Sequence, residues 1–408
     1  MSSLAIKGGP KLMGKERQMK SSWPSKGLEK ALCDYTGAKY CQLTSSGTAA
    51  LISSLYAVGC GPGDEVITTA YTWVATVGAI LRVNAVPIFA DIDPRTFCID
   101  PRDIERKISP ATKAILPVDL YGHPAPLLEI MALAEQHGLW VIEDACQAAT
   151  ADINGRKLGS IAHMTAFSWS GKPIYSHWGG GAYLTNDRRL YERGMLVGQH
   201  PTYITGVCQD PEVRKYASTG GMGDNTRAIA VNAMDQLLDA DARTNARIAN
   251  CRYLTERLSG LPGITTPYTR PGYKHVYHYY TCLWDEQGTG VPRDVFVKAV
   301  NAEGLYCVPY VRSANYAFTP QSMPVEAEGP IHMRAIFRER NLYGKGCPFL
   351  CPHVKHPPVY REGDLPVSEE MAKREFCLGQ PDLSPPNDER DMQLIVDVIT
   401  KVVPLAYA

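Results

Sequence analysis

The residues best suited to covalent chemistry are a lysine and an aspartate on two neighbouring segments. Lys172 stands in AFSWSGKPIYSHWGGG, residues 166–181, among serine, glycine and aromatic residues that can partly desolvate its side chain. Desolvation favours the neutral amine, which forms an imine with a carbonyl compound. Asp144 ends the apolar run LWVIED, 28 residues before Lys172. A surface lysine and a helix-capping aspartate are the ordinary alternatives, but the glycine-rich turn after Lys172 favours the catalytic interpretation.

A turn that could bind a phosphate lies in SSGTAAL, residues 45–51. Gly47 lets the backbone approach a ligand closely, and the amides of Gly47 and Thr48 open the predicted helix. Free N–H groups and the helix dipole both favour an anion at such a helix start. The ordinary alternative is a helix cap that binds no ligand.

Three further side chains could contact a flat ring. Trp73, in YTWVAT after a predicted strand, could stack on it, although a core aromatic residue is the ordinary alternative. Asp144 could face a pyridine nitrogen and keep it protonated, which makes the ring an electron sink. Gln147 could touch the same ring, whereas Glu143 points to the opposite face of its strand. Together these features match the requirements of pyridoxal 5′-phosphate (PLP).

The elements that must position these residues alternate between strands and helices. β-rich apolar runs, with helix-like segments between them, lie at residues 64–70, 85–93, 113–122 and 139–149. Such alternation predicts an α/β domain with a mainly parallel sheet flanked by helices, whose ligands bind beyond the carboxyl ends of the strands. We place this large PLP-binding domain at residues 1–263 and expect a smaller C-terminal α+β domain at residues 264–408.

Several ordered segments resemble the DegT/DnrJ/EryC1/StrS aminotransferases over nearly the whole chain. They include LAIKGGPK, SSGTAAL, GPGDEVITTAYTWVAT, VPIFADIDPRTFCIDP, EDACQAA, GMGDNTRAIAVNAMDQL and DLPVSEEMAKREFCLGQPDLSP. The resemblance implies a fold-type-I PLP transferase. It also implies that an amino group moves from glutamate or glutamine to a keto-sugar or keto-cyclitol, in amino-sugar or aminoglycoside-type biosynthesis.

The resemblance also implies roles for individual residues. Lys172 matches the lysine that holds the cofactor as a Schiff base, and Asp144 matches the acid on its pyridine nitrogen. The residues that match other cofactor contacts are Gln147, Trp73 on the ring face, and Gly47, Thr48 and Ser168 at the phosphate. Asn225 matches an asparagine that reaches the phosphate of the neighbouring subunit, which implies a homodimer with shared sites. His278 matches a histidine near the substrate mouth.

Two positions depart from the family pattern. Lys172 is the sixth residue from Phe167 where the family has the seventh, so an ungapped match places Pro173 at the lysine position. A deletion before Lys172 and an insertion after it restore the match, and a PLP enzyme with another outcome (dehydration or oxidative deamination) is the alternative. Asp119 stands where the family often has histidine, and it could face the substrate or cap a turn.

A possible metal site lies in the proline-rich stretch 341–360. Its thiols and imidazoles, which suit tetrahedral zinc, are Cys347, Cys351, His353 and His356. The tight spacing and the prolines favour a loop near the substrate entrance instead, and we predict no metal. A zinc-binding interaction protein that lacks catalysis is the alternative.

The composition limits the partners and the compartment. The 408 residues include 42 basic and 42 acidic side chains, a balance that predicts neither a nucleic-acid nor a membrane partner. No apolar stretch has the length that a signal sequence or a membrane span requires. The twelve cysteines are expected to be reduced, so we predict a cytoplasmic enzyme.

Overall fold

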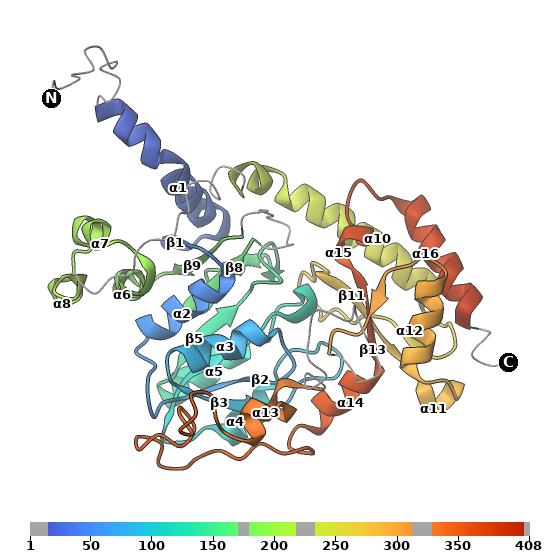
Figure 1. Cartoon of the computed structure of the whole chain (residues 1–408). Helices are drawn as coiled ribbons and strands as arrows, with labels where there is room; N and C mark the ends of the chain where they lie inside the picture. Colours follow the sequence, from blue (N-terminus) through green and yellow to red (C-terminus); the bar gives the residue numbers. More distant parts are fainter. Residues whose placement is uncertain (1–14, 170–178, 218–232, 312–328, 404–408) are drawn as a thin grey trace, which may run out of the picture.

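The computed structural model describes residues 15–169, 179–217, 233–311 and 329–403. A seven-stranded sheet forms the centre of the N-terminal part (Figure 1). Its strands run in the order β1 (Tyr40–Thr44), β9 (Gly181–Thr185), β8 (Met164–Ser168), β5 (Trp140–Asp144), β4 (Thr112–Leu116), β2 (Glu65–Thr69) and β3 (Val86–Ala90). All are parallel to their neighbours except β9, which is antiparallel to β1 and β8. The predicted mainly parallel sheet is confirmed.

Helices cover both faces of this sheet because its strands are apolar on both sides. Every residue of β2 and β8 is buried, as expected for a parallel sheet between two helical layers. One face packs against α1 (Lys15–Thr36), α4 (Pro101–Lys107) and α5 (Leu127–His137). The other packs against α2 (Gly47–Ala57), α3 (Val74–Arg82) and α6 (Arg188–Gly198).

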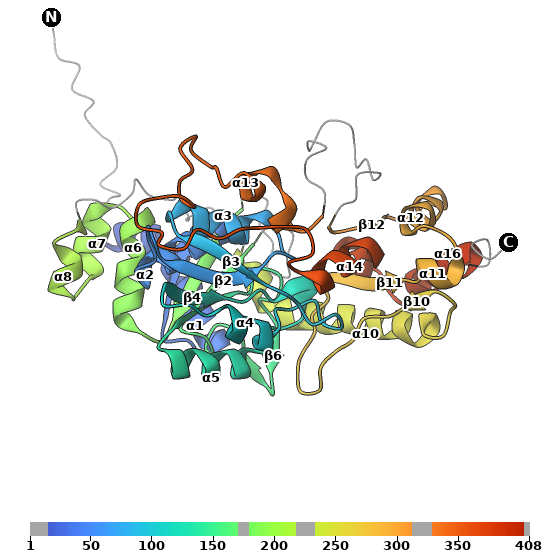
Figure 2. The same cartoon turned by 90° about the horizontal axis from the view of Figure 1, so that it is seen from below.

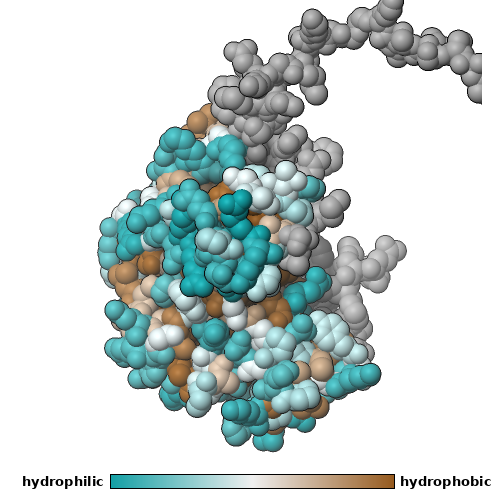
Figure 3. Space-filling model, turned by 90° about the vertical axis from the view of Figure 1, so that its left-hand side faces the viewer, coloured by the Kyte–Doolittle hydropathy of each residue, from teal (hydrophilic) through white to brown (hydrophobic). Residues whose placement is uncertain are grey.

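Several smaller elements complete the N-terminal part. They are η1 (Leu120–Gly122), β6 (Asp152–Ile153), β7 (Arg156–Lys157), α7 (Pro201–Val207) and α8 (Pro211–Arg214). Helices α6 to α8 lie at the end of the molecule that faces the viewer in Figure 3, where hydrophilic residues predominate. None of the described helices combines the length and the apolar character that a bilayer crossing requires.

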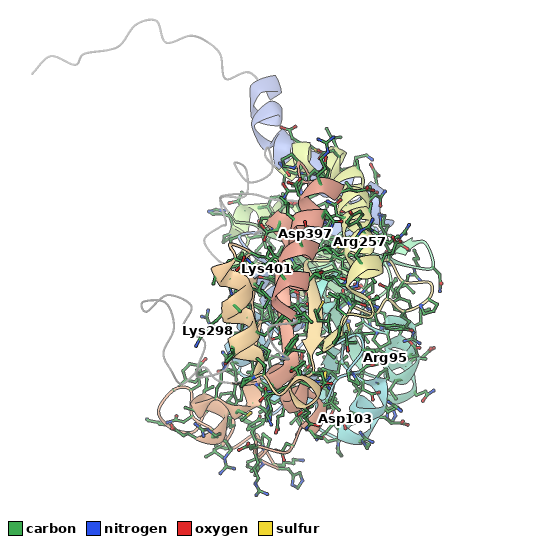
Figure 4. All side chains as sticks on the ribbon, turned by 90° about the vertical axis from the view of Figure 1, so that its right-hand side faces the viewer. Arg95, Asp103, Arg257, Lys298, Asp397 and Lys401 are labelled. Carbon is green, nitrogen blue, oxygen red and sulfur yellow. The ribbon has the colours of Figure 1, made fainter. Side chains whose placement is uncertain are left out.

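The C-terminal part contains a second sheet with its own core. Its antiparallel strands run in the order β10 (Ile264–Thr265), β11 (Tyr279–Trp284), β13 (Glu375–Gly379) and β12 (Cys307–Val308). The helices that share its core are α10 (Ala240–Leu258), α12 (Arg293–Ala302) and α16 (Glu389–Val402). On α16, Met392 and Ile399 face this core, whereas Asp397 and Lys401 point outward (Figure 4). The short α11 (Glu286–Thr289), α14 (Pro366–Arg374) and α15 (Gln380–Leu383) connect these elements.

The chain returns to the N-terminal part over residues 329–365. η3 (Ile331–Met333) and α13 (Ala335–Arg338) place Ile331 and Phe337 against α3 and β3 (Figure 2). Further along, Tyr360 Oη donates a hydrogen bond to Pro87 O at 2.7 Å. Much of the stretch expected to be a substrate-entrance loop is therefore packed onto the large sheet. The division of the chain at residue 263 stays a prediction.

A buried carboxyl group fixes the segment that follows β12. Glu375, the first residue of β13, is fully buried, and its Oε1 accepts a hydrogen bond from Val311 N at 2.8 Å. Arg293 donates to the Glu375 carbonyl oxygen at 2.6 Å. Burial raises the pKa of the Glu375 carboxyl to about 7, although Arg293 and the Val311 N–H favour the charged form.

This raised pKa predicts how stability depends on pH. The folded chain holds the Glu375 proton more tightly than the unfolded chain, in which the pKa has its ordinary value of 4.5. The free energy of unfolding should therefore fall between pH 4.5 and about 7, by up to about 1.4 kcal/mol per pH unit. Glu375→Gln should remove this contribution, so that the wild type loses stability relative to the variant as the pH rises.

Urea denaturation from pH 5 to pH 8 measures the free energy of unfolding of the wild type and of Glu375→Gln. The exposed Glu339→Gln serves as the control and should leave the pH dependence of the wild type intact. If the two proteins differed in free energy of unfolding by the same amount at every pH, the raised pKa of Glu375 would be contradicted.

Candidate active site

A cavity of about 900 Å³ lies where the carboxyl ends of β2, β5 and β8 meet the C-terminal part of the chain. This is the side of a parallel sheet at which ligands bind. The cavity wall brings together these predicted residues: Gly47, Thr48, Trp73, Asp144, Gln147, Ser168 and His278. Five sequence segments that are distant along the chain thus converge on one site.

One end of the cavity is suited to an anion. Helix α2 begins there, with Ser46 as its N-cap residue accepting a hydrogen bond from Ala49 N at 3.1 Å. A Cβ atom at Gly47 would lie 2.6 Å from Cys146 Sγ and 2.7 Å from Ser168 Cβ, so only glycine allows this close approach. The first N–H groups of a helix lack partners within it. These N–H groups at the start of α2, together with Thr48 and Ser168 of the cavity wall, are suited to bind a phosphate.

Asp144 is held firmly at the end of β5. Thr76 Oγ1 donates a hydrogen bond to Asp144 Oδ2 at 2.8 Å, and Cys146 N donates to Oδ1 at 3.2 Å. Thr76 lies 3.0 Å from the hydroxyl of Thr72 in turn. These contacts orient a buried carboxylate toward the cavity without consuming all its acceptor positions.

Trp73 supplies an apolar wall that is open to ligands. It is the N-cap residue of α3 and lines the cavity, yet 53% of its surface is exposed. A large exposed indole beside a buried carboxylate and a helix N-terminus can receive a flat ring on its face. The set of donors, acceptor and aromatic surface therefore fits PLP: the start of α2 would hold the phosphate and Asp144 would face the ring nitrogen.

Gln147 connects the two parts of the chain. Its Oε1 accepts a hydrogen bond from Tyr121 N at 2.8 Å, and its Nε2 donates to Tyr310 Oη at 3.0 Å. Tyr121 has a φ of 58°, a region that non-glycine residues seldom adopt, and this hydrogen bond helps to hold it there. Gln147 lines the cavity, as predicted, but both ends of its amide are already engaged. His278 lies nearby, with its main-chain N donating to Tyr121 O at 2.7 Å.

Asp119 does not line the cavity. Val118 does, and because successive residues of an extended chain alternate, Asp119 points to the other side, where it is fully buried. Its Oδ1 accepts a hydrogen bond from Ala125 N at 2.7 Å, which is the turn-capping alternative and not a substrate contact.

The buried carboxyl groups of Asp119 and Glu143 influence each other electrostatically. Burial and the neighbouring carboxyl raise the pKa of Asp119, and burial raises that of Glu143 to about 7. Burial therefore favours the protonated form of both acids. Glu143 thus faces away from the cavity, as strand alternation predicts.

Lys172 and Asn225 lie outside the described residues. The segment that carries Lys172 leaves the described structure at Trp169, directly after Ser168 of the cavity wall. It re-enters at Gly179, and Gly180 N then donates a hydrogen bond to Ser45 O at 2.8 Å. Both ends of this segment are therefore next to the cavity.

The structure adds residues that sequence reasoning missed, and it limits one alternative. The cavity wall also contains Tyr310, Arg334 and Asp382, together with Thr76 behind Asp144. Of these residues only Thr76 could have been found from the sequence, because it lies one helical turn after Trp73.

Within the described part of the chain no three His, Cys, Asp or Glu side chains are placed to share a metal ion. The zinc cluster considered for residues 347–356 is therefore not assembled.

Comparisons with known proteins agree with this geometry. The sequence profile of the DegT/DnrJ/EryC1/StrS aminotransferase family matches residues 15–329. The chain is similar to the L-glutamine:2-deoxy-scyllo-inosose aminotransferase of Streptoalloteichus tenebrarius, with 31% identity over 399 residues that cover 94% of this chain and 88% of that protein. It is also similar to the GDP-perosamine synthase of Caulobacter vibrioides, with 34% identity over 313 residues covering 74% and 82% of the two chains.

A solved structure extends the likeness to the fold. DesV of S. venezuelae, in complex with a ketimine intermediate, superimposes with a TM-score of 0.75 and 26% identity, over 93% of this chain and 89% of that one. The profile match includes the segments of Gly47, Trp73, Asp144 and Lys172. The chain belongs to the DegT/DnrJ/EryC1/StrS aminotransferase family.

Proposed function

We propose that this enzyme is a PLP-dependent aminotransferase that moves an amino group from glutamine or glutamate to a keto-cyclitol or keto-sugar. The observation that carries the proposal is the single cavity that combines the start of α2, the exposed face of Trp73 and the carboxylate of Asp144. The names of the two relatives support both acceptor types, since one acts on an inosose and the other is a GDP-perosamine synthase.

The proposal gives a role in this reaction to several residues of the cavity and to Lys172. When bound, the cofactor withdraws electrons from the substrate carbon that loses and regains a proton. Gly47, Thr48 and Ser168 hold its phosphate, and Trp73 covers one face of its ring. Asp144 keeps the ring nitrogen protonated, and Lys172 Nζ accepts the proton from the substrate carbon and returns it.

The compartment and the assembly are part of the proposal. None of the twelve cysteines forms a disulfide, which supports a reducing, cytoplasmic location. Asn225, matched to the family's phosphate contact from a neighbouring subunit, supports a homodimer with shared active sites.

The first prediction concerns Lys172. Lys172→Ala should remove the visible absorbance band of the bound cofactor and reduce turnover to background, because the imine and the proton carrier are lost together. Absorbance spectra of the purified protein, before and after addition of L-glutamine, measure both effects. A variant that kept the band and full turnover would place the reactive amine elsewhere.

The second prediction separates two buried acids. Asp144→Asn should lower kcat by roughly 100-fold or more, because the ring nitrogen loses its charged partner. Asp119→Asn is the matched control: Asp119 lies outside the cavity, and its amide oxygen can still accept from Ala125 N. Steady-state kinetics on both variants test the assignment, and equal losses in the two would contradict it.

The third prediction tests the shared sites. Lys172→Ala and Asn225→Ala should each be impaired, yet a hybrid dimer of the two contains one intact site and should regain about half the activity of the wild-type dimer. Co-expression with two affinity tags isolates the hybrid. A hybrid no more active than its parents would show that Asn225 acts within its own subunit.

A further inference from the structure

We infer that Arg334 binds the α-carboxylate of the amino-acid donor in this cavity and so favours amino acids over amines that lack this group; this inference rests on the proposed aminotransferase function. No sequence motif marks Arg334, and the family resemblance assigns it no role.

Arg334 places a cationic side chain in the cavity wall. It lines the cavity, and its Nε is buried with no hydrogen-bond partner among the described residues. Burial lowers the pKa of its guanidinium, and no described carboxylate opposes this shift. A buried donor without an acceptor is unfavourable, so this position makes sense when a ligand supplies the acceptor.

The main chain fixes Arg334 next to the proposed ring site. Arg334 N donates to Ile331 O at 3.1 Å, and Ile331 N donates to Ala70 O at 2.9 Å. Ala70 stands three residues before Trp73, which lines the same cavity. Arg334 is thus anchored to the strand end that also positions the proposed ring-stacking residue.

The charges of the wall favour a single carboxylate over a pyrophosphate. Among the described lining residues Arg334 is the only lysine or arginine, whereas Asp144 and Asp382 are acidic. One guanidinium presents a planar fork that matches one carboxylate in bidentate fashion. A nucleotide-linked acceptor would bring two charged phosphates to a wall whose described residues supply one cation and two acids. Every amino-acid donor carries the α-carboxylate, and a keto-cyclitol carries no charge.

Three probes of the holoenzyme test the inference. L-glutamine is the donor, 4-aminobutanamide is the same molecule without its α-carboxylate, and glutaramate is the same molecule without its α-amine and therefore cannot react. The variants are Arg334→Gln, Arg334→Lys, and Arg338→Gln as the matched control, because Arg338 is exposed at the end of α13, whose N-cap residue is Arg334.

The expected result is specific to the carboxylate. Arg334→Gln should raise the KM for L-glutamine by roughly 30-fold or more and weaken glutaramate binding in calorimetry by a similar factor. The rate with 4-aminobutanamide and the KM for the acceptor should not change. Arg334→Lys should recover part of the loss, and Arg338→Gln should behave as wild type. Because Arg334 Nε has no hydrogen-bond partner among the described residues, the thermal stability of the variants should be preserved.

Other outcomes overturn the inference. A higher KM for the acceptor with unchanged glutamine kinetics would place the anion on the acceptor, and loss of bound cofactor would place it on the cofactor phosphate. Unchanged glutaramate binding in Arg334→Gln would also contradict it. A wild-type enzyme that failed to react with glutamine or glutamate would contradict the proposed function instead, while glutaramate binding would still report on Arg334.

Discussion

The hydrogen bonds that hold the Asp144 carboxylate are the constraint on which the site depends. A carboxylate at the end of a buried strand is unfavourable unless donors satisfy it. Thr76 from α3 and the Cys146 N–H supply those donors, so the first turn of α3 and the turn after β5 must stay where they are. The same turn of α3 carries Trp73. One carboxylate therefore fixes the relative positions of the acid and the aromatic surface.

The opposite wall depends on how the C-terminal part of the chain is attached. Gln147 bridges Tyr121 and Tyr310, and Glu375 holds the segment of Tyr310 through Val311 N. Residues 329–365 then return across β3 and α3 and bring Arg334 to the cavity. The proposed donor-binding side of the site is thus built from segments that are distant from one another along the chain.

Sequence reasoning succeeded where local patterns carry the information. The alternation of apolar strands and helices was enough to predict a mainly parallel sheet. Motifs at strand ends led to Gly47, Trp73 and Asp144, and the family resemblance led to Ser168; all four line the cavity. The direction of a side chain at a strand end is harder to predict. Val118 and Asp119 are adjacent, and the register of the Val118–Asp144 bridge places Val118 in the cavity and Asp119 beside Glu143.

Residues supplied by distant segments escaped prediction for a different reason. Arg334 lies in a proline-rich stretch without periodicity, and its place in the site depends on packing between Phe337, α3 and β3. Tyr310 follows a two-residue strand, too short to give a pattern. No local propensity encodes such contacts.

The central claim, that Asp144 keeps the cofactor ring nitrogen protonated, can be tested directly by nitrogen NMR. The enzyme would be reconstituted with cofactor labelled with ¹⁵N in the ring. The account predicts the resonance of a protonated pyridine nitrogen in the wild-type holoenzyme. The resonance of an unprotonated nitrogen would contradict it.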